Sequence, residues 1–122
     1  MKNQEKNKTI KTIDAQGRTL GRVASEVAMS LMGKTKATFE RNIYSGFPVK
    51  VINASKLKIT AKKLDEIYHT RYSGMRGGLR VLKGTETAEK KGLKELLRLA
   101  TYQMLPGNKL RRIMMKNLKI ED

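Results

Sequence analysis

The chain has 122 residues, which suits one compact domain, and a hydrophobic fraction of 39% is enough for a modest core. Its charge is one-sided, with 27 Lys and Arg against 11 Asp and Glu and a formal net charge of +16. Cysteine is absent and there is a single histidine, which excludes disulfides, thiolate metal sites and a cysteine nucleophile.

The N-terminal part of the sequence is polar. Residues 1–8 are rich in lysine, and we expect them to form a flexible basic arm ahead of a single domain over residues 9–122. The segment 9–13 is β-prone, and turn residues follow it at 14–17.

The clearest element is a helix over residues 20–32, where apolar side chains recur at the spacing of one helix face. Thr19 is suited to start this helix and Gly33 to end it. The segment 28–35 nearly matches a nucleotide-binding P-loop, with Ala28 in place of the first glycine. A P-loop lies between a strand and a helix N-terminus, whereas this segment ends a helix, so we expect no nucleotide hydrolysis.

The middle of the chain is β-prone. Residues 48–53 form a β-branched run that predicts a strand, and 57–60 is a candidate for another. Residues 68–82 contain two short β-like pieces around the glycine-rich segment 73–78, which indicates a turn and favours a hairpin tip.

Two further helices and a strand are predicted in the last third. An amphipathic pattern over 93–104 stops near Pro106, and apolar residues within 110–114 predict a short helix. Residues 119–120 are a candidate strand. Strands that alternate with helices favour an α/β fold in which helices cover a sheet.

Acidic residues are missing from three long stretches that contain many lysines and arginines: 41–64, 67–85 and 96–120. A small domain with so large an excess of positive charge repels itself unless a polyanion neutralises it. A membrane surface or an acidic protein are alternatives. Nucleic acid is favoured, because the sequence has no long basic amphipathic segment and no lipidation motif.

Two motifs in the 67–85 stretch are typical of nucleic-acid binding. Residues 74–77 (Gly-Met-Arg-Gly) match the backbone-clamping loop of KH modules, although that loop needs a helix on each side. Tyr68 and Tyr72 flank Arg71 and are candidates for stacking on unpaired bases, but we expect at least one of them to pack in the core.

No catalytic, metal or cofactor site is indicated. His69 has no metal partner nearby in the sequence and is expected to be a packing or surface residue. No apolar run approaches the roughly 20 residues of a membrane span, and residues 1–12 lack the apolar core of a secretory signal. We therefore expect no membrane partner, no small-molecule substrate, and a location in the cytoplasm or an organelle matrix.

Five short segments, in order along the chain, carry a more specific signal. They are 14–25, 31–34, 51–56, 71–80 and 104–112. Together the segments resemble the L-thirteen family of large-subunit ribosomal proteins, over roughly residues 10–121, and 118–120 is similar to that family's closing strand. The resemblance implies a three-layer α/β fold with a mostly parallel, four-stranded sheet flanked by helices. It also implies binding to large-subunit (23S-type) ribosomal RNA, contact with neighbouring ribosomal proteins and a role early in subunit assembly.

The sequence departs from the family pattern at several positions, and it stops at Asp122 without the usual bacterial C-terminal tail. Two of the departures add arginine and one removes lysine, so the basic character is kept. The departures are Ala61 and Arg111 for glycine, Tyr72 for histidine, Arg76 for proline and Gly107 for lysine.

We interpret the chain as a structural ribosomal RNA-binding protein that contacts phosphates and shape more than base edges. The alternative is a free regulatory protein that binds RNA or DNA; an enzyme acting on nucleic acid would need clustered carboxylates or a usable histidine. The candidate RNA-binding residues are basic residues taken from the matching segments and from the predicted last helix. They are Arg18, Arg22, Lys34, Arg71, Arg76, Arg80, Lys109, Arg111, Arg112 and Lys116.

Overall fold

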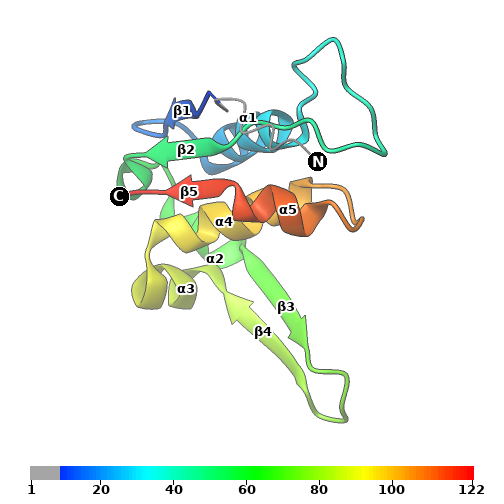
Figure 1. The fold of residues 1–122 in the computed structure, drawn as a ribbon. Coiled ribbons are helices and arrows are strands. Elements are labelled where there is room, and N and C mark those ends of the chain that lie inside the picture. The colour runs from blue at the N-terminus through cyan, green and yellow to red at the C-terminus, as the bar shows by residue number, and fades with distance from the viewer. Residues whose placement is uncertain (1–8) are drawn as a thin grey trace.

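The computed structural model describes residues 9–122, so the arm predicted at residues 1–8 lies outside the described residues. Strands and helices alternate along the chain (Figure 1). The strands are β1 (Lys11–Asp14), β2 (Val49–Ile52), β3 (Tyr68–Tyr72), β4 (Leu79–Lys83) and β5 (Leu118–Ile120). The helices are α1 (Leu20–Met32), α2 (Ala61–Glu66), α3 (Gly84–Lys91), α4 (Leu93–Met104) and α5 (Arg111–Lys116), with a 3-10 turn η1 at Ala54–Lys56.

The main sheet has three parallel strands in the order β1-β2-β5, and β3 and β4 form a separate antiparallel pair. The α/β class is confirmed, but the expected four-stranded parallel sheet is wrong. The candidate strand at 57–60 makes only an isolated bridge between Thr19 and Lys58. The chain leaves extended structure there because Thr60 caps α2, accepting a hydrogen bond from the backbone N–H of Lys63 at 3.3 Å.

The helices cover one face of this sheet. Val49 and Val51 of β2 are buried against α1, and α1 packs in turn against α4. Both crossovers run in the same direction across the sheet, so right-handed connections place their helices on one side. Thr12 and Lys119, on the opposite face, are exposed. No described helix covers that face, so residues 9–122 form a sheet layer and a helical layer, and the three-layer arrangement implied by the resemblance is not found among them.

The antiparallel pair is a hairpin that projects away from the body of the molecule (Figure 1). The glycine-rich segment 73–78 connects its strands, as predicted. The expectation that Tyr68 or Tyr72 is a core residue is wrong, because both are 65% exposed. No second layer covers the outer part of the hairpin, and only His69, near its base, is buried.

The predicted helices over 20–32 and 93–104 have the bounds of α1 and α4. Helices α2 and α3 were not predicted, because each is short and mostly polar. None of the helices in residues 9–122 is long and apolar enough to cross a membrane.

The loop after α1 returns closely over the helix end. Gly33 ends α1 in the left-handed conformation (φ 79°), and its N–H donates to the carbonyls of Met29 and Ser30. A Cβ added at Gly46 would lie 1.8 Å from the carbonyl oxygen of Leu31. Glycine at position 46 therefore sets how closely the loop packs on α1.

We expect Gly46→Ala to lower the free energy of unfolding by about 1–3 kcal/mol, because either the loop or the end of α1 must shift. Gly21→Ala is the control: position 21 is helical, and an added Cβ meets no atom within 4 Å. Because alanine has a higher helix propensity than glycine, Gly21→Ala should leave the free energy of unfolding unchanged or raise it by up to about 1 kcal/mol. Denaturant unfolding of both variants measures the difference, and equal values would contradict this role of Gly46.

Candidate nucleic-acid interface

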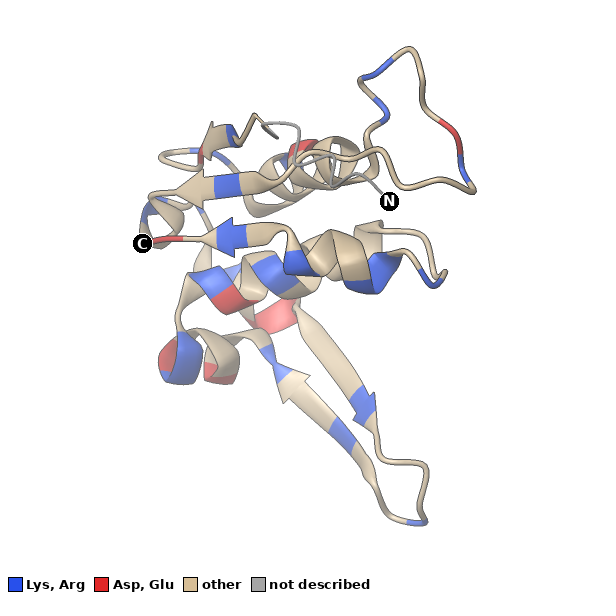
Figure 2. Ribbon diagram, viewed as in Figure 1, with Lys and Arg blue, Asp and Glu red and all other residues tan. Residues whose placement is uncertain are grey.

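The projecting hairpin carries a concentrated positive charge. Arg71 of β3 and Arg80 of β4 are directly opposite each other in the strand register, and both are exposed. Like charges opposite each other on one face of a hairpin are destabilising. Arg76, also exposed, adds a third positive charge at the tip, and Figure 2 shows no acidic residue on the hairpin. These three residues define the hairpin surface. Its uncompensated positive charge favours the binding of a negatively charged partner.

The hairpin tip depends on glycine. Gly74 and Gly77 have φ of 86° and 71°, in the left-handed region that favours glycine. A Cβ at Gly78 would lie 1.9 Å from the Ser73 hydroxyl oxygen. Strands flank the segment 74–77, so it is a hairpin tip and not the helix-flanked loop of a KH module.

A second basic surface surrounds α5. Arg112 and Lys116 lie four residues apart on this helix and are exposed, as is Lys109 just before it. The guanidinium of Arg111 lies over the Tyr102 ring, 3.9 Å from its centroid, which fixes that side chain by a cation–π contact. The α5 surface is defined by its four basic residues: Lys109, Arg111, Arg112 and Lys116.

The spacing of Leu110, Ile113 and Met114 in the sequence predicts that they form the face of α5 that packs against the core. Met114 is buried and Leu110 half-buried, but Ile113 is 44% exposed. Ile113 and Met114 are successive residues and so lie about 100° apart around the helix, which leaves Ile113 at the edge of the contact that buries Met114.

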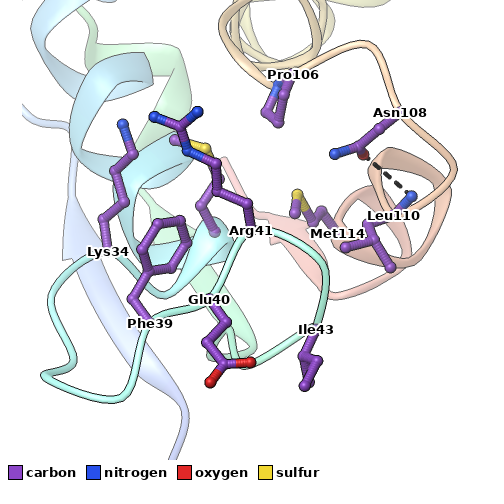
Figure 3. A pocket seen from close by; sticks show the side chains of 10 residues that line it. Lys34, Phe39, Glu40, Arg41, Ile43, Pro106, Asn108, Leu110 and Met114 are labelled. Atoms are coloured by element: carbon purple, nitrogen blue, oxygen red, sulfur yellow. Dashed lines mark hydrogen bonds between the residues drawn. The ribbon is translucent and has the colours of Figure 1, made fainter.

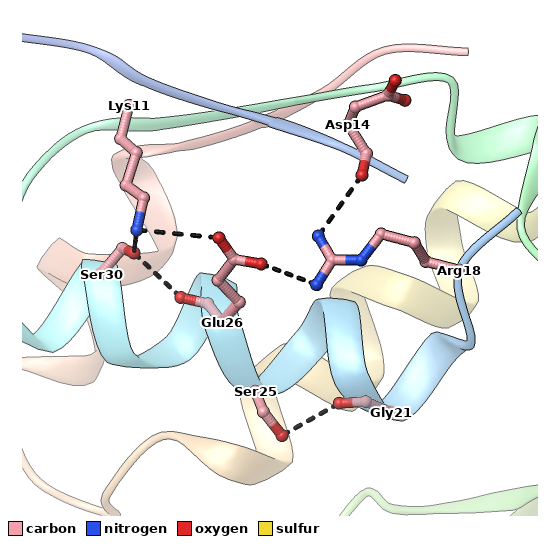
Figure 4. A network of polar contacts seen from close by, with 7 residues as sticks. All are labelled: Lys11, Asp14, Arg18, Gly21, Ser25, Glu26 and Ser30. Atoms are coloured by element: carbon pink, nitrogen blue, oxygen red, sulfur yellow. Dashed lines mark hydrogen bonds and ion pairs between the residues drawn. The ribbon is translucent and has the colours of Figure 1, made fainter. Parts of the chain in front are cut away.

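Arg18 differs from the other candidate residues because an acid neutralises it. Its guanidinium donates to the Glu26 carboxylate at 2.7 Å, and Lys11 lies 3.8 Å from the same carboxylate (Figure 4). The network joins the chain around β1 to α1. Arg22, exposed on α1, forms no ion pair with any described residue.

Most of the acids that form ion pairs do so with lysines and arginines that were not candidates. Acids on α2 and α4 and near the C-terminus pair with Lys62, Arg98, Lys94 and Lys50, none of which was a candidate. Apart from Arg18, no candidate forms an ion pair within residues 9–122. The positive charge of the candidates therefore remains available to a partner.

Lys34 lies in the loop after α1, and the fold places this loop beside the connection from α4 to α5 (Figure 3). Lys34 thereby lines the same cavity as Asn108, although 74 residues separate the two in the sequence (108 − 34). Arg41 and Tyr102 also belong to this region and were not among the candidates. Arg41 was detectable only as part of the acid-free stretch 41–64, and no sequence signal marked Tyr102.

The fold does not bring all the candidates together. The hairpin surface and the α5 surface lie on different parts of the molecule (Figures 1 and 2). Among the described residues, no group of three or more His, Cys, Asp or Glu is placed to hold a metal ion.

A family model described as "Ribosomal protein L13" matches residues 8–120. The chain belongs to the ribosomal protein L13 family. It is 42% identical over 108 residues to "Large ribosomal subunit protein uL13" of Clostridioides difficile, a match that covers 88% of this chain and 75% of that protein. It is 40% identical over 119 residues to the protein of the same name from Syntrophotalea carbinolica, covering 98% and 83%. The corresponding protein of Nitratiruptor sp. is 44% identical over 108 residues, covering 88% and 76%.

Membership in the L13 family confirms the resemblance found in the sequence motifs and makes the chain a structural protein and not an enzyme. The segment 28–35, which nearly matches a P-loop in sequence, does not have the geometry of one. Gly33, within that segment, is the C-cap of α1, where carbonyl oxygens and not N–H groups point outward.

His69 connects the hairpin to the body of this L13 protein. It is 9% exposed, and its Nδ1 lies 3.3 Å from the side-chain nitrogen of Gln103 on α4. Burial lowers the pKa of His69 below its usual value of 6.5, against a smaller opposing effect of Glu95. The ring is therefore neutral at pH 7, and Nδ1 accepts the hydrogen bond from Gln103.

We expect the imidazole NMR signal of this single histidine to titrate with a pKa below 6.5. Because the folded state disfavours the protonated form, the stability associated with His69 is fully present above about pH 6.5 and falls as the pH drops through the lowered pKa. His69→Gln should reduce this acid-induced loss of stability. A pKa at or above 6.5 in the folded protein would contradict the packing described here.

Proposed function

We propose that this chain is a structural constituent of the large ribosomal subunit and binds the RNA of that subunit chiefly through phosphates. The observation that carries the proposal is the opposed pair Arg71 and Arg80 on a projecting hairpin without acids. Two arginines held opposite each other destabilise the free protein slightly and become favourable when a phosphate lies between them.

The two basic surfaces support a specific mode of binding. The hairpin surface projects from the body, whereas the α5 surface belongs to the body itself (Figure 2). One protein then contacts two RNA segments and ties them together, which is how a structural RNA-binding protein differs from an enzyme with one site. The proposed RNA-binding residues are the nine candidates without an acidic partner. Arg18 acts mainly in holding β1 to α1.

Phosphate contacts of this kind position RNA without reading its sequence. The exposed Tyr68 and Tyr72 offer rings to unpaired bases in addition. We further propose that residues 9–122 act as one domain, that the RNA is of the 23S type, and that the protein joins the subunit early in its assembly. Neighbouring ribosomal proteins are the other partners, and the cytoplasm is the proposed location.

A free regulatory protein that binds RNA or DNA would have the same positive charge but would not co-sediment with ribosomes. Sedimentation of a cell lysate through a sucrose gradient separates the two functions. We expect the protein in the large-subunit and ribosome fractions at low salt. Its presence only at the top of the gradient would reject the ribosomal function.

The hairpin surface makes a sharp prediction about affinity and stability. Arg71→Gln/Arg80→Gln should weaken binding to deproteinised large-subunit RNA roughly ten- to a hundred-fold and reduce the slope of log affinity against log salt by about 2. The melting temperature should stay the same or rise, because the change removes a like-charge pair. Filter binding at several salt concentrations, together with thermal unfolding, measures both.

The matched control is Lys62→Gln/Lys94→Gln, which removes the same charge. The ammonium of Lys62 lies 4.0 Å from the Glu66 carboxylate and that of Lys94 lies 3.0 Å from the Asp122 carboxylate, so each lysine already forms an ion pair within the protein. The control should keep most of the affinity. Equal losses in the two double variants would mean that net charge alone, and not the hairpin surface, holds the RNA.

A further inference from the structure

A cavity of about 250 Å³ lies between the loop after α1 and the connection from α4 to α5 (Figure 3). This volume is just below the range of about 300–1,000 Å³ that is usual for drug-sized ligands, and it suits a smaller planar group. The cavity adjoins the α5 surface, because Asn108 lines both the cavity and the surface depression at Arg111 and Arg112.

Two kinds of chemistry line the cavity. Phe39 from the loop faces Leu110 and Met114 from the other side, which gives apolar walls with one aromatic ring. Lys34 and Arg41 are exposed on one rim, and neither forms an ion pair within residues 9–122. Glu40 also lines the cavity, but its carboxylate points away from the charged ends of Lys34 and Arg41 (Figure 3). An aromatic ring beside two positive charges matches a nucleotide, whose base stacks while its phosphate is neutralised.

Asn108 adds a polar group that is held in place. Its side-chain oxygen accepts a hydrogen bond from the backbone N–H of Leu110 at 3.1 Å. The side-chain nitrogen is directed away from Leu110 and toward the cavity (Figure 3). It is therefore placed to donate a hydrogen bond to an acceptor on the edge of a base.

The loop that forms one wall is anchored at several points. The Lys36 ammonium donates to the carbonyl oxygen of Ser45 at 2.7 Å and lies 3.9 Å from the centre of the Phe47 ring. The side-chain nitrogen of Asn117, at the end of α5, donates to the Tyr44 hydroxyl. These contacts tie the loop to itself and to α5, so the cavity is largely formed before any ligand arrives.

We propose that this cavity binds a single unpaired nucleotide of the RNA, with its base against Phe39 and its phosphate at Lys34 and Arg41. The inference rests on the proposed function and adds a site to it. The protein thereby recognises a base that is turned out of its helix, in addition to the phosphates bound at the other surfaces.

The test uses the full chain with deproteinised large-subunit RNA. Ultraviolet cross-linking, trypsin and nuclease digestion, and mass spectrometry should find one nucleotide attached to the tryptic peptide 37–41, which contains Phe39. Phe39→Leu, which keeps an apolar side chain but removes the ring, should abolish this cross-link. The same substitution should weaken RNA binding about 5- to 100-fold.

A second variant covers the case in which Phe39→Leu does not fold. Arg41→Gln changes an exposed residue and should weaken binding several-fold, whereas Lys62→Gln, with the same loss of charge, should not. The nucleotide site is overturned if binding is salt-sensitive but gives no cross-link at 37–41, or if folded Phe39→Leu keeps full affinity. Either result leaves the proposed function intact, and the cavity would then bind an apolar side chain of a neighbouring protein. If the wild-type protein binds the RNA without salt dependence, the proposed function fails as well.

Discussion

The fold depends on the burial of helix α1. Val23, Val27 and Leu31 of this helix are completely buried, and α1 contacts both the main sheet and α4. Because the same helix packs against both, it fixes where α4 lies relative to the sheet, and α4 in turn holds the base of the hairpin through Gln103 and His69. The basic surfaces are therefore placed by an apolar contact that involves none of their charges.

The few acids neutralise only some of the lysines and arginines, as in the two hydrogen bonds from Arg98 to Glu95 at 2.6 and 2.9 Å. Acids gather on α2, α3 and the start of α4, near the base of the hairpin (Figure 2). Lysines and arginines without an ion pair occur on several elements, including Arg22 on α1, but on the hairpin and on α5 no acid lies among them. The positive charge is thus least compensated on these two surfaces.

Sequence periodicity predicted α1 and α4 to the residue, because a long apolar stripe leaves little choice of face. The hairpin was also detectable, since glycines marked its tip. The number of strands in the main sheet was not, because the 57–60 segment has strand-like composition but no partner strand beside it. The same limit applied to the site: basic stretches could be read from the sequence, whereas the proximity of Arg41 to Asn108, and the pairing of Arg18 with Glu26, arise only from folding.

The order of strands in the main sheet has a consequence for how the chain folds. Central strand β2 pairs with residues 11–14 on one side and with residues 118–120 on the other. The second pairing closes a loop of almost seventy residues, which is slow because of the entropy lost on closure. The hairpin closes over only a few residues, but an isolated two-stranded hairpin is at best marginally stable in water. During synthesis on a ribosome, the hairpin therefore forms and reopens until α4 packs against its base. One edge of β2 stays unpaired until the last strand, β5, has been synthesised.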